Sequence, residues 1–373
     1  MLSILIIACA YFGLALLAGI ISRRLSLPSA LIEVSLGVLA QWAATAWLGA
    51  GLGADETWIK FLAVMGAMLL TFMAGAEVSP EILRSKWRES LAIGGFSFLG
   101  PFLFCTIMAK YFLHWTNSAS WLCGVALSGT SVAVVYTVTL ELGLNRTEKG
   151  KTLLAACFVT DFLTICALGL IFTSFSARTL FLLAASLVIK HNGNHAAAGA
   201  EIKFLILALL ALGALAVWAG IEAVLPAYLA GIVMAGRMGR EERLVKHLQA
   251  VSFGFLTLFF FIRAGALVSV PVLIAAPGLL LVLLIGQVLS KSVAVFPVTL
   301  IHRYSPKSGA FTTLLMSTGL AFGTIASIFG LQHNIISQTQ YSLLIGAIVV
   351  SALVPTIIAI KLFSPDSGTV SEK

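Results

Sequence analysis

The chain has 373 residues, of which 60% are hydrophobic and only 10% are charged, and its mean hydropathy is +1.04. This composition excludes a soluble globular protein, because several apolar runs reach the ~18–20 residues that a helix needs to span a bilayer. The net charge of +8 does not indicate a nucleic-acid partner, since the basic residues stand in short loops between the apolar runs. We therefore predict an all-α, polytopic integral membrane protein.

The apolar runs predict about thirteen transmembrane helices. They cover residues 2–21, 29–49, 58–77, 90–113, 120–140, 151–174, 178–190, 203–220, 223–236, 248–268, 271–300, 309–330 and 341–362. Most Lys and Arg residues then fall on one side of the membrane, if the N-terminus is outside and the C-terminus is cytoplasmic. We expect this membrane to be a bacterial inner (cytoplasmic) membrane.

Two of the predicted helices are interrupted by residues that hold a membrane helix together poorly. The fifth helix is interrupted by Ser128, Gly129, Thr130 and Ser131. The twelfth is interrupted by Ser317, Thr318 and Gly319, and again by Gly323 and Thr324. The two interruptions are seven crossings apart, so they predict inverted repeats whose discontinuous helices cross near the membrane midplane. Close helix packing is the alternative role of such small residues.

Asp161 is the leading candidate for a functional residue, because it stands inside the sixth apolar run. A charge at bilayer depth costs roughly 2.5–3.5 kcal/mol on insertion scales, so an intramembrane carboxylate indicates a functional site. Such a carboxylate can exchange a proton for a cation, and we expect Asp161 to bind both in turn. A buried pair with Lys291 or Arg263 is the structural alternative. The hydroxyl of Thr160 is either a further ligand or bonded to its own helix backbone.

Four other charged residues in or beside the apolar runs have both a functional and a structural interpretation. Lys291 lies deep in the eleventh run, where it can neutralise Asp161 or the C-terminal ends of the broken helices, titrate itself, or reach the cytoplasmic side. Arg263 stands near the outer end of its helix, within easy reach of water. Glu33 and Glu77 stand near helix ends, and we expect them to be structural or to line a funnel, with Glu33 also able to face a dimer interface.

The sequence gives no sign of an enzyme or of a cofactor. It lacks the HExxH and GxSxG motifs and a nucleotide-binding glycine loop after a strand. The five cysteines all stand in apolar runs without metal-ligand spacing, and we interpret them as small hydrophobic residues.

Seven segments, taken in order, resemble the second family of monovalent cation:proton antiporters, which includes sodium/proton exchangers and potassium-efflux antiporters. The start of the family's second helix resembles LPSALIEVSLGVLAQ, and its LxFxAGLExxP segment resembles LLTFMAGAEVSPEILR. Its SSTAxxxxxLxELGxxxTxxGK core resembles ALSGTSVAVVYTVTLELGLNRTEKGK, and its ion-binding aspartate falls at VTDF. The remaining matches are LPAYLAGIVMAG, LTLFFFIRAG and STGLAFGTIAS.

This resemblance implies the sodium/proton antiporter fold, usually in a homodimer. Residues 1–363 would form the membrane domain, and residues 364–373 a short cytoplasmic tail. Scaffold and dimerisation helices would lie at about 1–80 and 203–268, a linker helix at about 178–190, and transport-core helices at about 90–174 and 271–362.

The resemblance also implies roles for single residues. Asp161 would carry the cation or the proton, with Thr130, Ser131 and Thr160 as auxiliary ligands. Lys291 matches a basic residue on the helix before the second crossing. Electrogenic relatives carry two consecutive aspartates, but the first position here is Thr160, so we expect electroneutral exchange of one cation for one proton.

We expect Na⁺, or else K⁺ or Li⁺, to be the exchanged cation. The first alternative is a sodium-coupled symporter for an organic solute on a similar crossed-helix fold. The second is a sensor or channel-like subunit that transports nothing by itself.

Overall fold

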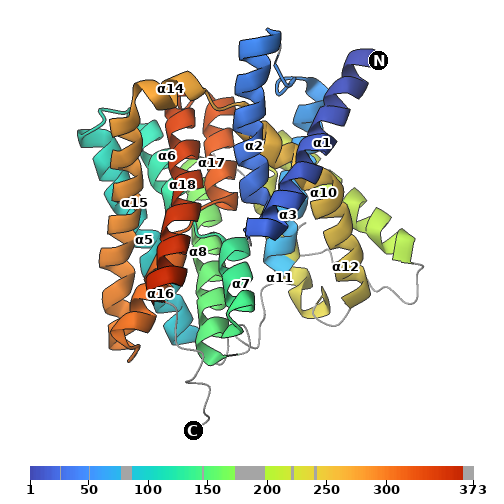
Figure 1. The fold of residues 1–373 in the computed structure, drawn as a ribbon. Coiled ribbons are helices and arrows are strands. Elements are labelled where there is room, and N and C mark those ends of the chain that lie inside the picture. The colour runs from blue at the N-terminus through green and yellow to red at the C-terminus, as the bar shows by residue number, and fades with distance from the viewer. Residues whose placement is uncertain are drawn as a thin grey trace. The chain divides into compact units, whose positions relative to one another are not determined.

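The computed structural model describes residues 1–25, 27–49, 51–76, 86–144, 147–172, 198–219, 222–238 and 242–363, which form helices joined by short loops (Figure 1). Eleven helices in these ranges are long and apolar enough to cross a membrane. A twelfth apolar stretch, Val224–Ala235, is shorter than a full crossing and corresponds to the ninth predicted helix. The seventh, at 178–190, lies outside the described residues. The prediction of an all-α membrane protein is confirmed, and about thirteen helices remains an approximate count.

The chain divides into two compact units. The first comprises Met1–Ile21, Ile32–Glu81 and Ile165–Leu267, and the second comprises Ser22–Leu31, Ile82–Thr164 and Val268–Lys373. The first unit holds most of α1 (Leu2–Leu25) and of α2 (Ser29–Ala43), then η1 (Ala44–Leu48), α3 (Thr57–Ala76), α10 (Ala198–Ala219), α11 (Val224–Met238), α12 (Glu242–Val251), η3 (Ser252–Leu256) and α13 (Thr257–Ala266). Whether scaffold and core functions divide along the chain as expected above stays a prediction.

The second unit contains both interrupted helices. Its helices are α5 (Trp87–Tyr111), α6 (Asn117–Ser128), α7 (Val132–Glu141), most of α8 (Glu148–Phe172), α14 (Val270–Ala275), α15 (Pro277–Ile301), α16 (Pro306–Met316), α17 (Ala321–Gln332) and α18 (Gln338–Phe363). Within this unit α15 packs against α5, α16 and α18, while α6 packs against α5 and α17. The residues that the sequence marks as an ion site, from Ser128 to Asp161 and from Lys291 to Gly319, all belong to it.

The start of the eleventh predicted helix was placed wrongly. Residues 271–300 do not form one helix, because α14 ends at Ala275 and α15 begins at Pro277. Ala276 between them has φ −129° and ψ 52°. A residue that precedes proline is sterically disfavoured in the helical conformation, and proline itself suits the first turn of a helix. The periodic apolar pattern continues across this break and therefore hides it.

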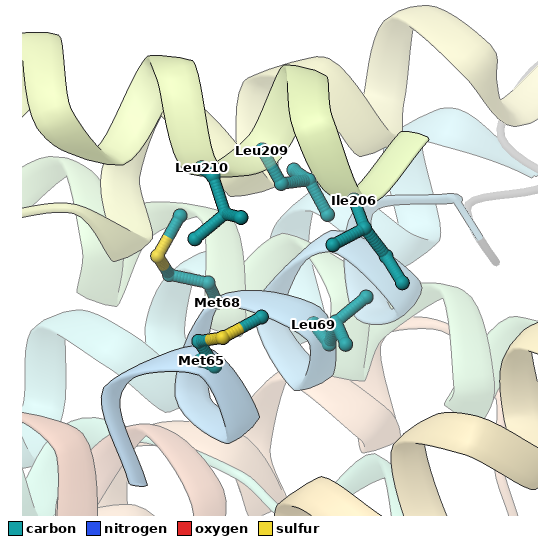
Figure 2. Close-up of a pocket in the computed structure, with 6 residues that line it drawn as sticks. All are labelled: Met65, Met68, Leu69, Ile206, Leu209 and Leu210. Carbon is teal, nitrogen blue, oxygen red and sulfur yellow. The ribbon is translucent and has the colours of Figure 1, made fainter. Parts of the chain in front are cut away.

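Helices α3 and α11 of the first unit approach each other closely through glycines. A Cβ atom at Gly231 would overlap the carbonyl oxygen of Phe72, and one at Gly75 would overlap the carbonyl oxygen of Tyr228. Small residues allow this kind of backbone contact between membrane helices. By contrast, α3 and α10 leave a small pocket between them, lined by Met65, Met68, Leu69, Ile206, Leu209 and Leu210 (Figure 2). None of these side chains carries an oxygen atom, so the pocket offers no oxygen ligand for an alkali cation.

We expect Gly231→Ala to destabilise the protein by about 1–3 kcal/mol, because the added methyl group overpacks the contact between α3 and α11. The melting temperature of the detergent-solubilised protein measures this effect. Gly19→Ala is the matched control, since a Cβ at Gly19 of α1 meets no atom within 4 Å. Equal melting temperatures for the two variants would contradict the packing described here.

Candidate ion-binding site at the helix crossing

The two interrupted helices cross each other at their breaks. Residues 129–131 separate α6 from α7, and residues 317–320 separate α16 from α17. The half-helix α6 packs against α17, and α7 packs against α16. The breaks are also joined directly, because the backbone N–H of Ser131 donates to the carbonyl oxygen of Thr318 at 2.6 Å. Both breaks therefore lie where the sequence predicts them, with Ser128 as the last residue of α6.

A local hydrogen bond explains where the half-helix α7 begins. Ser131 caps α7, since its hydroxyl accepts from the backbone N–H of Val134 at 3.4 Å. The predicted second interruption of the twelfth helix is wrong, because Gly323 and Thr324 lie inside α17. The Thr324 hydroxyl donates to the carbonyl oxygen of Leu320 one turn earlier, a bond that lets threonine stay within a helix. Small polar residues thus mark a break only where their backbone also leaves the helix.

Lys291 lies at the negative ends of both broken helices. Its ammonium donates to the carbonyl oxygens of Gly129 and Met316, each at 2.7 Å, and to the hydroxyl of Thr130 at 3.0 Å. Gly129 caps the C-terminus of α6, and Met316 is the last residue of α16. The side chain is fully buried. A cation at a helix C-terminus is favourable, and here one cation serves two termini at once.

Asp161 lies near the same crossing, but it is not paired with Lys291. Its side chain is buried, with 2% of its surface exposed, and the backbone N–H of Thr130 faces its carboxylate. Both residues lie in the described part of the chain, and no ion pair joins their side chains. The ammonium of Lys291 instead donates to the carbonyl oxygen of Gly129, the residue before Thr130.

One oxygen of the Asp161 carboxylate is free to accept a ligand. Oδ1 is buried and has no hydrogen-bond partner among the described residues. A buried polar atom without a partner is costly, so such an atom calls for an explanation such as a bound ion or water. A cation or a proton at Oδ1 removes this cost.

Gln287 is a polar residue of the site that the sequence did not reveal. It lies on α15 one turn before Lys291, and its side chain is fully buried. Its Nε2 is 3.5 Å from the carbonyl oxygen of Ser317, and its Oε1 has no partner within the described part of the chain. Charged residues inside the apolar runs indicated the site, and glutamine carries no charge. The spacing of four residues from Lys291, which puts both on one helix face, was the available signal.

The other hydroxyl groups tie α8 to its neighbours. Thr160 donates to the carbonyl oxygen of Gly94 in α5 at 3.1 Å or to that of Ala156 at 3.0 Å. The hydroxyls of Ser128 and Thr164 are 3.5 Å apart. The Thr160 hydroxyl thus positions α8 in this structure, and its role as a ligand stays a prediction.

The remaining predicted residues lie elsewhere. Arg263 of α13 is buried and donates from Nε to the carbonyl oxygen of Ala54 at 2.7 Å, rather than reaching water as its position suggested. Glu33 of α2 is also buried. Both belong to the first unit. Glu77 lies outside the described residues.

Two broken membrane helices that cross beside a buried carboxylate define a secondary transporter. A family model described as the transmembrane part of sodium/hydrogen exchangers matches residues 12–175 and 167–363. The chain therefore belongs to the sodium/hydrogen exchanger family, as its motifs predicted, and it is a transporter rather than an enzyme.

Individual relatives agree with this assignment. A probable Na⁺/H⁺ antiporter of Methanocaldococcus jannaschii is 26% identical over 333 residues, which cover 83% of this chain and 84% of that protein. An Na⁺/H⁺ antiporter of Enterococcus hirae is 22% identical over 360 residues, covering 91% and 92%. Among solved structures, the sodium proton antiporter MjNhaP1 from M. jannaschii at pH 8 superposes with a TM-score of 0.71 at 17% identity, covering 98% of this chain and 99% of that one. This last likeness supports the fold.

Proposed function

We propose that this integral membrane protein exchanges a monovalent cation for H⁺ by alternating access, with both substrates competing for Asp161. Na⁺ is the proposed cation, and K⁺ and Li⁺ are the alternatives. The observation that carries the proposal is the buried, unpartnered Oδ1 of Asp161 beside the helix crossing, in the part of the chain that the structure describes. The names of the relatives, which are Na⁺/H⁺ antiporters, support the choice of cation.

The exchange is electroneutral, one cation for one proton. Asp161 is the only carboxylate at the crossing among the described residues, and Thr160 occupies the preceding position. The ammonium of Lys291 is engaged by three acceptors from the broken helices. Lys291 held in this way keeps its proton through the transport cycle. Asp161 is then the residue that exchanges a proton for a cation.

The assembly and topology are part of the same proposal. The chain forms a homodimer through its scaffold helices, and the core helices move against that scaffold. The N-terminus lies outside a bacterial inner membrane and the C-terminus lies in the cytoplasm, which places most basic residues inside. Thr130 and Ser131 hold the breaks in place beside the ion.

Exchange in everted vesicles from antiporter-deficient cells tests the proposal. Addition of Na⁺ is expected to relieve the quenching of a pH-sensitive dye, and Li⁺, K⁺ and Rb⁺ at several pH values give the selectivity. Uptake of an organic solute without proton counter-flux would instead support a symporter. In proteoliposomes, a membrane potential generated by exchange would contradict electroneutrality.

We propose that the unpartnered Oε1 of Gln287 is a further oxygen ligand of the cation. Gln287→Leu is then expected to raise the Na⁺ concentration for half-maximal exchange by about tenfold, which corresponds to about 1.4 kcal/mol, while the maximal rate changes little. The dye assay over a series of Na⁺ concentrations measures both quantities. Gln332→Leu, an identical change at an exposed position at the end of α17, is the control. An unchanged half-saturation would exclude Gln287 as a ligand.

A further inference from the structure

Two sulfur atoms lie side by side at the helix crossing. The thiol Sγ of Cys157 on α8 is 3.7 Å from the thioether Sδ of Met316 at the end of α16. Both side chains are completely buried. Two ligands that each lie ~2.3 Å from a tetrahedral metal are about 3.8 Å apart, so this sulfur pair already has the spacing of one edge of such a site.

A third donor atom accompanies the two sulfurs. Asp161 follows Cys157 by one helical turn, so both side chains project from the same face of α8. Its Oδ1 is buried and lacks a partner among the described residues.

We propose that Cys157 and Met316, with Asp161 as an oxygen ligand, bind a soft monovalent cation such as Cu⁺ or Ag⁺, and that the bound ion blocks exchange. Thiolate and thioether ligands together favour Cu⁺ and related soft ions, whereas alkali cations prefer oxygen. On binding, the S–H bond of Cys157 breaks, a metal–sulfur bond forms, and the proton leaves to water. The net charge of the site is therefore unchanged, but Asp161 is no longer available to Na⁺ or H⁺.

Metal binding depends on the sulfur pair alone, whereas the block of exchange rests on the function proposed above. A soft ion reaches this buried pair by the route that leads to Asp161. Excess Na⁺ is therefore expected to slow inhibition, because it occupies the same carboxylate. Binding and inhibition are measured separately, so that a failure of one is distinguishable from a failure of the other.

The binding experiment uses the full chain carrying Cys9→Ser and Cys166→Ser, which removes the exposed and the half-buried thiol. Titration with Ag⁺ is followed by calorimetry, and X-ray absorption at the silver edge reports sulfur neighbours. We expect one strongly bound Ag⁺ per chain. Cys157→Ser should remove it, and Met316→Leu, which preserves the apolar packing, should weaken it by about tenfold. Cys123→Ser, a buried thiol of α6, is the control that should keep it.

Silver binding that survives Cys157→Ser unchanged, or a bound ion with a single sulfur neighbour, would overturn the proposal. In proteoliposomes, Ag⁺ should inhibit the chain that carries Cys9→Ser and Cys166→Ser. Exchange by the Cys157→Ser variant should persist and become insensitive to Ag⁺. Inhibition that remains in this variant would refute the blocking role, whatever the binding data show. If the chain binds Ag⁺ through both sulfurs but exchanges no cation, the site stands and the antiport function fails.

Discussion

Replacing Asp161 with asparagine is expected to abolish cation-dependent proton exchange, down to the background of vesicles without the protein. An amide cannot take up and release the proton or balance the charge of the cation, and the alternating mechanism then has no substrate carrier. The carboxylate Oδ1 is buried without a partner in the described part of the chain, whereas the nearby hydroxyls of Thr130 and Thr160 are bonded to backbone carbonyls. These two hydroxyls are therefore not available to bind the cation in place of the carboxylate.

The same variant should fold at least as well as the parent protein. Burying an ionisable group costs free energy, and the asparagine side chain avoids that cost while it retains the shape of the aspartate. Dye dequenching and the melting temperature, measured on the same preparation, separate loss of transport from loss of fold. Asp55→Asn is the matched control, because Asp55 is exposed and pairs with Lys60 at 3.0 Å on the surface. Full exchange by the Asp161 variant would remove this residue from the mechanism.

Hydropathy and residue type were sufficient to predict most of the fold. The apolar runs mark the spans because a bilayer requires about 20 apolar residues per helix, and a lone aspartate inside such a run is conspicuous. The breaks at Gly129 and Thr318 were visible because small polar residues are unusual in the middle of a span. The error at Gly323 and Thr324 arose from the same reasoning, since threonine can bond back to its own helix.

The contacts of Lys291 could not be chosen from sequence. Its position allowed a pair with Asp161, a helix-end contact, titration or an approach to water, and these differ only in where the side chain points. The structure places it on the carbonyl oxygens of Gly129 and Met316, residues that are 162 and 25 positions away in the chain. The sequence could not predict that Oε1 of Gln287 lacks a hydrogen-bond partner either, because this depends on which atoms pack around it.

Replacing Lys291 with methionine is expected to destabilise the protein by about 3–5 kcal/mol, as for loss of one partner from a buried charged interaction. Methionine fills a similar volume but donates no hydrogen bonds. The carbonyl oxygens of Gly129 and Met316 then lose this partner inside a buried site, and each such loss costs about 1–3 kcal/mol. The melting temperature in detergent measures the effect, and Lys291→Arg should recover part of it because arginine keeps the charge.

Lys60→Met is the control for this substitution, since Lys60 is half-exposed and its pair with the exposed Asp55 should contribute only about 0–1 kcal/mol. The two Lys291 variants also test whether the buried charge takes part in coupling. If Lys291 only neutralises two helix ends, a folded Lys291→Arg protein exchanges cation for proton without generating a membrane potential, like the parent. If Lys291 instead releases a proton in each cycle, the parent generates a potential and the arginine variant does not, because arginine stays protonated. A stable, fully active Lys291→Met protein would contradict both roles and leave the helix ends to be neutralised by water.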